Sequence, residues 1–259
     1  MRRGISPVVA TVILASIMLT VVSVAIYYST TLIDMNRQLM EYEYSKSLLA
    51  YAASALEQVS FGTGGARSVR LSLSSTGLNF ERSSTPLVVS INGREVLRLL
   101  PGSVKLCGGS LVTTVPRLLY PETGFFEEVD RLVVEEGEPL AVAYEIFSGR
   151  ACAVLETYRV RATYSGLTHV QQGLQSLPYN FYVIHVINMS FGRLGGSGTV
   201  LLVFRNRGVV VNEYRFDTPV LNVVAQYGSK SSSLTLTGSP SALGSVVIVK
   251  VSQVEVGTG

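Results

Sequence analysis

Histidine, cysteine and tryptophan are scarce in this chain of 259 residues, which has two His, two Cys and no Trp. His169 and His185 are too few and too isolated to form a metal cluster, and the two cysteines lack the C-x-x-C spacing of zinc sites. The hydrolase patterns G-x-S-x-G and H-E-x-x-H are both missing. The sequence therefore predicts a protein that is not an enzyme, with no catalytic residues, no metal site and no cofactor.

Charge is also sparse, because only 15% of the residues are Asp, Glu, Lys or Arg. The net charge of +3 comes without a basic stretch, so no nucleic-acid partner is expected. The acidic stretch 127–136 offers carboxylates to a divalent ion, but we interpret it as a solvated loop and strand edge. The glycine-rich run 195–198 lacks the Lys-Ser/Thr that follows a phosphate loop, and it predicts a turn between strands.

One long apolar run is present, and it lies at the N-terminus. It covers residues 5–28, directly after Arg2, Arg3 and Gly4, and the next charged side chain is Asp34. A helix over this run spans roughly 36 Å at about 1.5 Å per residue, enough to cross a bilayer core of about 30 Å. Arginines on the N-terminal side alone place that end in the cytoplasm and the remainder of the chain outside.

Small and hydroxyl-bearing residues recur along the apolar run and permit close approach between helices. A solitary anchor does not need them, so they favour a helix that packs in a bundle. A plain signal anchor of a surface protein stays open as the alternative. Proline is tolerated in the first turn of a helix, where its missing N–H is harmless. The residues expected to serve helix assembly are Pro7, Val8, Val9, Ala10, Ala15 and Ser16.

After the initiator Met, the chain begins with the residues Arg2, Arg3, Gly4, Ile5, Ser6, Pro7, Val8 and Val9. This order, followed by the apolar run, resembles the N-terminus of archaeal type IV pilins with a class III signal peptide. The resemblance implies that a membrane prepilin peptidase cuts between Gly4 and Ile5, and that the apolar helix then packs in the core of a pilus. It also implies a secretion ATPase and a membrane platform protein as partners. Many bacterial type IV pilins carry Glu where this chain has Val9, and the archaeal type commonly lacks that Glu.

Helical spacing continues past the apolar run, over residues 34–61. The apolar set there is Leu39, Leu48, Leu49, Ala52, Ala53, Leu56 and Val59, and the polar side carries Glu41, Glu43, Lys46 and Glu57. The glycines that follow Phe61 predict the end of the helix. We therefore expect a leader over 1–4, one helix over 5–61 and an extracellular β-rich domain over 66–259. Within the helix, 5–28 would form the transmembrane or pilus-core part and 34–61 the amphipathic part.

The remainder of the chain shows the alternation of strands. Asn92-Gly93, between 87–91 and 94–100, predicts a type I′ hairpin. The expected fold class is α+β, a long N-terminal hydrophobic helix followed by a large, mostly antiparallel β-sandwich-like domain, with a soft boundary near 166–178. Further strands are predicted over 131–135, 140–147, 151–164, 181–189, 199–205, 209–216, 220–226, 233–237 and 245–256.

Two modifications are suggested by single residues. Outside the cell, Cys107 and Cys152 would form a disulfide, with two buried free thiols as the alternative. Asn188 begins the N-x-S sequon 188–190, and its glycosylation depends on whether the side chain points outward.

Together these features predict a structural protein that acts through contacts with other molecules. The expectation is a type IV pilin-like subunit, inserted in the cell membrane as a precursor, cut after Gly4 and assembled through its hydrophobic helix into a homo-oligomeric surface filament. The β domain would face outward and serve adhesion or subunit contacts. The alternative is a membrane-anchored surface protein that binds a sugar or a surface-layer ligand without forming long filaments. An anchored hydrolase lacks catalytic residues that can be named.

Overall fold

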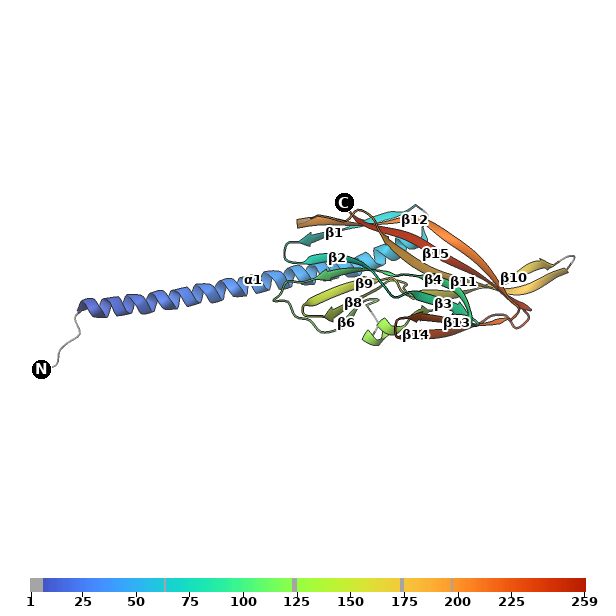
Figure 1. Ribbon diagram of the computed structural model, residues 1–259, viewed down its shortest axis with the longest axis horizontal. Coiled ribbons are helices and arrows are strands. Elements are labelled where there is room, and N and C mark those ends of the chain that lie inside the picture. The colour runs from blue at the N-terminus through green and yellow to red at the C-terminus, as the bar shows by residue number, and fades with distance from the viewer. Residues whose placement is uncertain (1–6, 63, 123–124, 173–174, 197) are drawn as a thin grey trace.

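The computed structural model describes residues 7–62, 64–122, 125–172, 175–196 and 198–259. Figure 1 shows one long helix that extends from an elongated body of β-strands. The helix α1 covers Pro7–Phe61, and its second half runs into the body. The chain is therefore of the α+β class, with a long N-terminal helix followed by mostly antiparallel sheets, as predicted.

The strands form three sheets. The six-stranded sheet has the order β1-β12-β15-β11-β10-β7, the four-stranded sheet β14-β13-β3-β4 and the five-stranded sheet β2-β5-β9-β8-β6. Neighbours are antiparallel except for the pairs β11·β15 and β7·β10. The bounds are β1 Ala66–Leu73, β2 Gly77–Arg82, β3 Leu87–Ile91, β4 Arg94–Leu99, β5 Gly102–Cys107, β6 Arg117–Tyr120, β7 Val133–Val134, β8 Val142–Phe147, β9 Ala151–Glu156, β10 Val160–Gln172, β11 Gln175–Phe191, β12 Gly198–Phe216, β13 Val220–Tyr227, β14 Lys230–Thr237 and β15 Gly244–Thr258, with a short 3-10 helix η1 at Phe126–Asp130.

The predicted hairpin at Asn92-Gly93 is confirmed. β3 and β4 pair around it, and both turn residues have positive φ angles, 48° at Asn92 and 82° at Gly93. A type I′ turn needs positive φ at both positions, and few residues other than Asn and Gly adopt that conformation cheaply. The side chain of Asn92 also accepts a hydrogen bond from the backbone N–H of Asn222 at 2.8 Å, which ties the turn to β13.

The body contains two apolar cores on opposite faces of the six-stranded sheet. In β11, Tyr182 and Ile184 belong to one core, whereas Ile187 and Met189 belong to the other. Because successive side chains of a strand point to opposite faces, this switch from even to odd positions places the cores on the two sides of the sheet. The four-stranded sheet covers one core. The second half of α1 and the five-stranded sheet cover the other.

The structure differs from the strand prediction in several places. The predicted strand 151–164 is divided at residues 157–159, where the chain leaves the five-stranded sheet as β9 and enters the six-stranded sheet as β10. The predicted strands 199–205 and 209–216 are instead one strand, β12, whose register shifts between Asn206 and Gly208. The sequence prediction missed β2, β5 and β6, because these strands are short and their apolar alternation is brief.

The soft boundary expected near 166–178 falls within one hairpin. β10 and β11 pair from Val160↔Val186 out to Gln172↔Gln175, so the strands before and after this segment are direct neighbours. In Figure 1 this hairpin forms the end of the body that lies farthest from the free end of α1.

The packing of α1 against the body predicts a large loss of stability when a buried helix side chain is truncated. Leu56 is fully buried between the sheets. We expect Leu56→Ala to lower the free energy of unfolding by about 2–5 kcal/mol, because the lost transfer free energy and the cavity act together. Denaturant unfolding of the full chain in detergent micelles, followed by circular dichroism, measures the loss. Gln58→Ala, on the exposed side of the same turn, serves as the control and should change the value by under about 0.5 kcal/mol.

Candidate functional site

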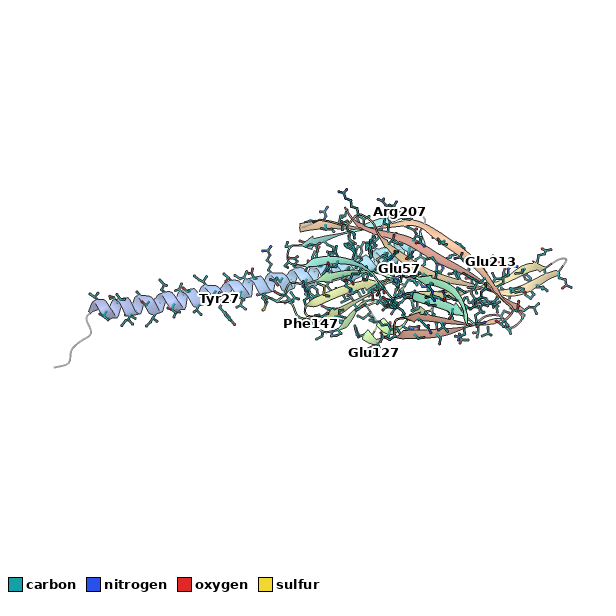
Figure 2. All side chains as sticks on the ribbon, in the orientation of Figure 1. Tyr27, Glu57, Glu127, Phe147, Arg207 and Glu213 are labelled. Atoms are coloured by element: carbon teal, nitrogen blue, oxygen red, sulfur yellow. A yellow bond between two sulfur atoms is a disulfide. The ribbon has the colours of Figure 1, made fainter. Side chains whose placement is uncertain are left out.

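The first half of α1 is an apolar helix that no other part of the described chain covers. We call residues 8–33 the apolar rod; they contain no charged side chain, and every one of them is exposed. Figure 2 shows side chains projecting from all sides of the helix around Tyr27. At about 1.5 Å per residue the rod is about 39 Å long. By length and composition, α1 is able to cross a membrane.

Most Ser and Thr hydroxyl groups of the rod are bonded within the helix itself. Ser16, Thr20 and Ser23 donate to the carbonyl oxygens four residues earlier at 2.8–2.9 Å, and Thr30 and Thr31 make equivalent bonds. An unbonded hydroxyl or backbone group costs several kcal/mol in hydrocarbon. With these bonds made, the rod presents an all-round apolar surface to lipid or to other helices.

The residues assigned to processing and assembly fall in two groups. Arg2, Arg3, Gly4 and Ile5 lie outside the described residues. Pro7 opens α1, and the other predicted assembly residues follow it on the exposed part of the rod: Val8, Val9, Ala10, Ala15 and Ser16. The structure therefore places the assembly residues on the uncovered helix.

Leaving the rod, the helix crosses a short neck, residues 34–40, which is exposed apart from the half-buried Gln38. Leu39 was expected on the apolar face of the amphipathic part. That expectation was wrong, because Leu39 is 40% exposed and the buried face begins at Tyr42. From Tyr42 to Ser60, buried positions recur at helical spacing, so the predicted amphipathic character holds for this part of the helix.

A carboxylate just beyond the neck is tied to the turn between β1 and β2. Glu41 accepts hydrogen bonds from the backbone N–H groups of Ser74, Ser75 and Thr76 at 2.6, 2.8 and 3.2 Å, and from the hydroxyls of Ser75 and Thr76. Burial alone would raise the pKa of Glu41, but these donors stabilise the carboxylate and bring its pKa below the usual value. The contact fixes the helix where it enters the body.

A second carboxylate lies where the helix meets β8. Glu145 is 1% exposed, and it accepts a hydrogen bond from the Tyr42 hydroxyl at 2.8 Å. Its other oxygen lies 3.3 Å from Nζ of Lys46, which is itself buried, and 3.7 Å from Nε of Arg117. Burial, followed by the hydrogen bond to Glu145, raises the pKa of Tyr42. The tyrosine therefore remains a neutral donor at this junction.

The third tie lies near the end of α1. Glu57 pairs with Arg161 of β10, accepts the Leu140 N–H at 3.1 Å and accepts the Tyr120 hydroxyl at 3.2 Å. The Arg161 guanidinium also stacks over the Phe61 ring, 4.9 Å from its centroid. Glu57, labelled in Figure 2, is only 9% exposed. One glutamate thus connects the helix to β6, β10 and the segment before β8.

The last turn of α1 is bonded to the six-stranded sheet. The Asn206 side-chain amide donates to the carbonyl oxygens of Val59 and Ser60 at 3.0 and 3.3 Å, and the Ser252 hydroxyl donates to Ser60 at 2.7 Å. The final carbonyls of a helix have no partner within it, so these donors complete the helix end. Asn206 lies where the register between β12 and β15 shifts, and this local irregularity orients its side chain toward the end of α1.

Sequence reasoning missed these ties. It placed Lys46 and Glu57 on a solvated side of the helix, and this was wrong, because Lys46 is 4% exposed and Glu57 9% exposed. The signal was available in their spacing: Lys46 and Glu57 share one helical face with Leu49 and Ala53. A charged residue on an otherwise apolar helix face is therefore a candidate for a buried ion pair.

The two cysteines are joined. Cys107 and Cys152 face each other in the antiparallel pair β5·β9 and form a disulfide. It cross-links neighbouring strands at the edge of the core that receives α1. Asn188 lies in β11, is partly buried, and donates through its side-chain amide to Gln253 of β15 at 2.7 Å. The same amide nitrogen would carry a glycan, and the glycosylation of Asn188 stays a prediction.

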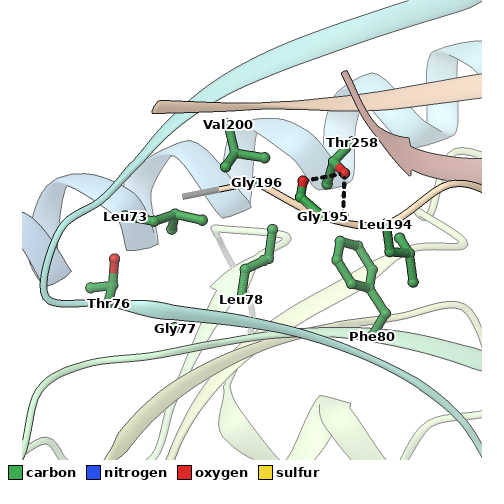
Figure 3. Close-up of a pocket in the computed structure, with 10 residues that line it drawn as sticks. All are labelled: Leu73, Thr76, Gly77, Leu78, Phe80, Leu194, Gly195, Gly196, Val200 and Thr258. Carbon is green, nitrogen blue, oxygen red and sulfur yellow. Dashed lines mark hydrogen bonds between the residues drawn. The ribbon is translucent and has the colours of Figure 1, made fainter. Parts of the chain in front are cut away.

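A hollow of about 370 Å³ lies between β2 and the start of β12. Figure 3 shows the residues that line it. Leu73, Leu78, Phe80 and Val200 give it an apolar lining, and Thr258 closes one side through hydrogen bonds to Gly195. None of the described lining residues is ionisable, so the hollow offers contact area but no acid or base. Within the described ranges, no group of three or more His, Cys, Asp or Glu side chains is placed to hold a metal ion.

Comparison with protein-family models, curated protein sequences and solved structures finds no match for this chain. The candidate site therefore stands on the residues and geometry described above.

The buried pair at the helix end predicts an asymmetric mutational response. Glu57→Gln should lower the free energy of unfolding by about 3 kcal/mol, because the Arg161 side chain, which is only 14% exposed, is then left without a counter-charge. Adding Arg161→Met to that variant should restore most of the loss. Equilibrium denaturation measures both. Glu95→Gln, which breaks the exposed pair with Arg98, is the control and should cost under about 1 kcal/mol. A loss as large for Glu95→Gln would contradict this account.

His185 predicts a pH dependence of stability. Its ring contacts Phe61 of α1 edge-on, and burial, with help from Lys250 and Arg161, lowers its pKa to about 4. Between pH 6.5 and about 4 the unfolded chain binds a proton that the folded chain does not, so the free energy of unfolding falls as the pH drops through this window. His185→Gln should flatten that slope in a pH series of denaturation curves, whereas exposed His169→Gln should keep it. Equal slopes in all three proteins would refute the assignment.

Proposed function

We propose that this chain is a type IV pilin-like structural subunit of an archaeal cell-surface filament. It is made as a membrane precursor, cut by a prepilin peptidase after Gly4 and assembled through α1, with the β body facing outward for adhesion or subunit contacts. The single observation that carries the proposal is the apolar rod, which is uncovered on every side yet continues without interruption into the core of the body.

The order of residues around Gly4 supports the processing step. Cleavage removes Arg2 and Arg3, so the net charge of the chain falls from +3 to +1, and the rod becomes the N-terminal segment of the mature protein. Two arginines at that end hold the precursor in the membrane, since charge does not enter the hydrocarbon core cheaply. Without them the rod can leave the lipid for a bundle of other rods, where apolar packing replaces lipid contact. A secretion ATPase and a membrane platform protein would drive that transfer.

The rigid connection between rod and body supports a filament rather than a simple tether. A protein that is only anchored works equally well with a flexible linker between membrane segment and domain. Here the neck is helical, and Glu41, Glu145 and Glu57 tie the helix to the body at successive levels. This arrangement transmits the orientation of the rod to the body, which a regular assembly requires.

Coexpression of the precursor with its prepilin peptidase tests the proposal. We expect the product to begin at Ile5 by N-terminal sequencing, and we expect surface filaments by electron microscopy when the ATPase and platform protein are also present. Gly4→Leu should block both processing and filaments, because a bulky side chain at the cut site prevents access.

The other outcomes separate the alternatives. An intact Met1, with the protein held in the membrane, would leave a surface protein that binds a ligand such as a sugar or surface-layer component. A cut beyond Tyr28 would leave a secreted protein. Either result would refute the filament proposal.

A further inference from the structure

Two sheets end together on each of two opposite sides of the body. On one side lie β1 and β2, edge strands of the six- and five-stranded sheets that are joined by the turn 74–76. On the other side lie β7 and β6, the opposite edge strands, and η1 connects them in the chain. At about 4.8 Å per strand, the two edges are about 19 Å apart across the five-stranded sheet and about 24 Å across the six-stranded one. Figure 1 shows β1 toward the upper margin of the body and β6 toward the lower margin.

These two sides carry exposed charges of opposite sign. On the side of β1 and β2, five exposed arginines form no ion pair with any described residue; they are Arg67, Arg70, Arg82, Arg193 and Arg205. On the side of η1, four exposed glutamates form none within the described ranges; they are Glu122, Glu127, Glu135 and Glu136. Other charges nearby are paired within the chain, such as Arg207 with Glu255 and Lys230 with Asp130. We call the two surfaces that these sets define the basic side and the acidic side.

Each side also carries an exposed apolar feature. On the acidic side, Phe125 directly precedes η1 and is 78% exposed, whereas its neighbour Phe126 packs edge-on against Tyr144. On the basic side lies the hollow of about 370 Å³ between β2 and the start of β12, whose described lining contains no ionisable group (Figure 3). Pockets that hold small molecules measure about 300–1,000 Å³, so the hollow has room for an aromatic ring. Exposed aromatic side chains are typical anchors of protein interfaces.

We propose that the bodies of neighbouring copies dock side by side, with Phe125 of one copy in the hollow of the next and the acidic side of the first facing the basic side of the second. The inference rests on the proposed filament function and adds to it a specific contact between bodies. The occupant of the hollow is a second copy because this chain itself supplies both the exposed ring and the opposite charge. Complementary charges of this kind fix the orientation of an interface and exclude wrong partners.

The contact uses two different surfaces, so it is heterologous. Every docked pair leaves one hollow and one Phe125 unused, and the same contact therefore repeats from copy to copy. Figure 2 shows Glu127 at the lower margin of the body and Arg207 at the upper margin, so the two sides lie across the body rather than at its ends. A shift across the body joins them and leaves every α1 pointing the same way. Subunits inserted in one membrane by the same signal share that common direction.

Introduced cysteines test the contact. Both native cysteines are in the disulfide, so added cysteines are the only free thiols. Leu194 lines the hollow and is 42% exposed, so it tolerates replacement. We expect the full chain with both Phe125→Cys and Leu194→Cys, coexpressed with the peptidase, ATPase and platform protein, to give a ladder of covalent oligomers with a short bis-maleimide. The two single variants coexpressed should stop at dimers, and neither alone should cross-link, because each copy then offers only one half of the contact.

Phe147 supplies the matched control, since it is an aromatic residue at the end of β8 that is 50% exposed and belongs to neither side. Phe147→Cys combined with Leu194→Cys should cross-link about tenfold less than the Phe125 variant. Glu127→Arg with Glu135→Arg should lower the Phe125–Leu194 yield about fivefold, because like charges then face each other. Loss of filaments from Phe125→Cys, but not from Phe147→Cys, would also support the contact. Equal cross-linking yields at the two phenylalanine positions would overturn the proposal.

Filament assays separate this inference from the function on which it rests. Normal filaments from the double-cysteine chain, with no cross-link between positions 125 and 194, would remove the docking contact and leave the filament function intact. Absence of filaments from a correctly processed wild-type chain would remove the filament function, and the contact between filament subunits with it.

Discussion

The rest of the structure depends on one helix that serves two environments. α1 satisfies its own backbone, so the same element can lie in lipid or among other helices at one end and in a protein core at the other. Its side chains decide which environment applies: residues 8–33 are uncharged and exposed, and Tyr42 to Ser60 are buried at helical spacing. The change occurs within the neck, and no break in the helix accompanies it.

Three glutamates, two from α1 and one from β8, join the helix to the body. Buried ion pairs contribute little net stability, because desolvation offsets most of their attraction. Their value lies in geometry, since a carboxylate with two or three donors accepts few positions. Glu41 and Glu57 reach from the helix to a turn and to several strands, and Glu145 reaches from β8 to Tyr42 and Lys46 of the helix. Apolar packing alone would let the helix slide or rotate, whereas these contacts define its depth and its rotation.

The sequence predicted features that depend on neighbouring residues, and it missed contacts between residues far apart in the chain. Length, apolar content and the glycines after Phe61 determine the helix almost by themselves, and Asn92-Gly93 determines its hairpin through backbone sterics. The division of 151–164 between two sheets could not be predicted, because it depends on which neighbours each half meets. The pairing of Glu57 with Arg161 spans 104 positions, and no local pattern encodes it. The exposure of the predicted assembly residues from Val8 to Ser16 follows from composition alone, whereas the exposure of Tyr44 and Tyr51 depends on how the sheets cover the helix.

The neck explains how the body and the rod avoid interfering with each other. Residues 34–40 are exposed apart from the half-buried Gln38, carry the first charges of the helix, and span about 10 Å. The headgroup layer on one side of a bilayer is about 5–8 Å thick, so a rod held in the hydrocarbon core keeps the body just clear of the lipid surface. The same spacing serves a bundle of rods, because bodies that begin beyond the apolar segment do not prevent the rods from approaching each other. A chain with these proportions can pass from membrane to bundle without refolding, and only the surroundings of the rod change.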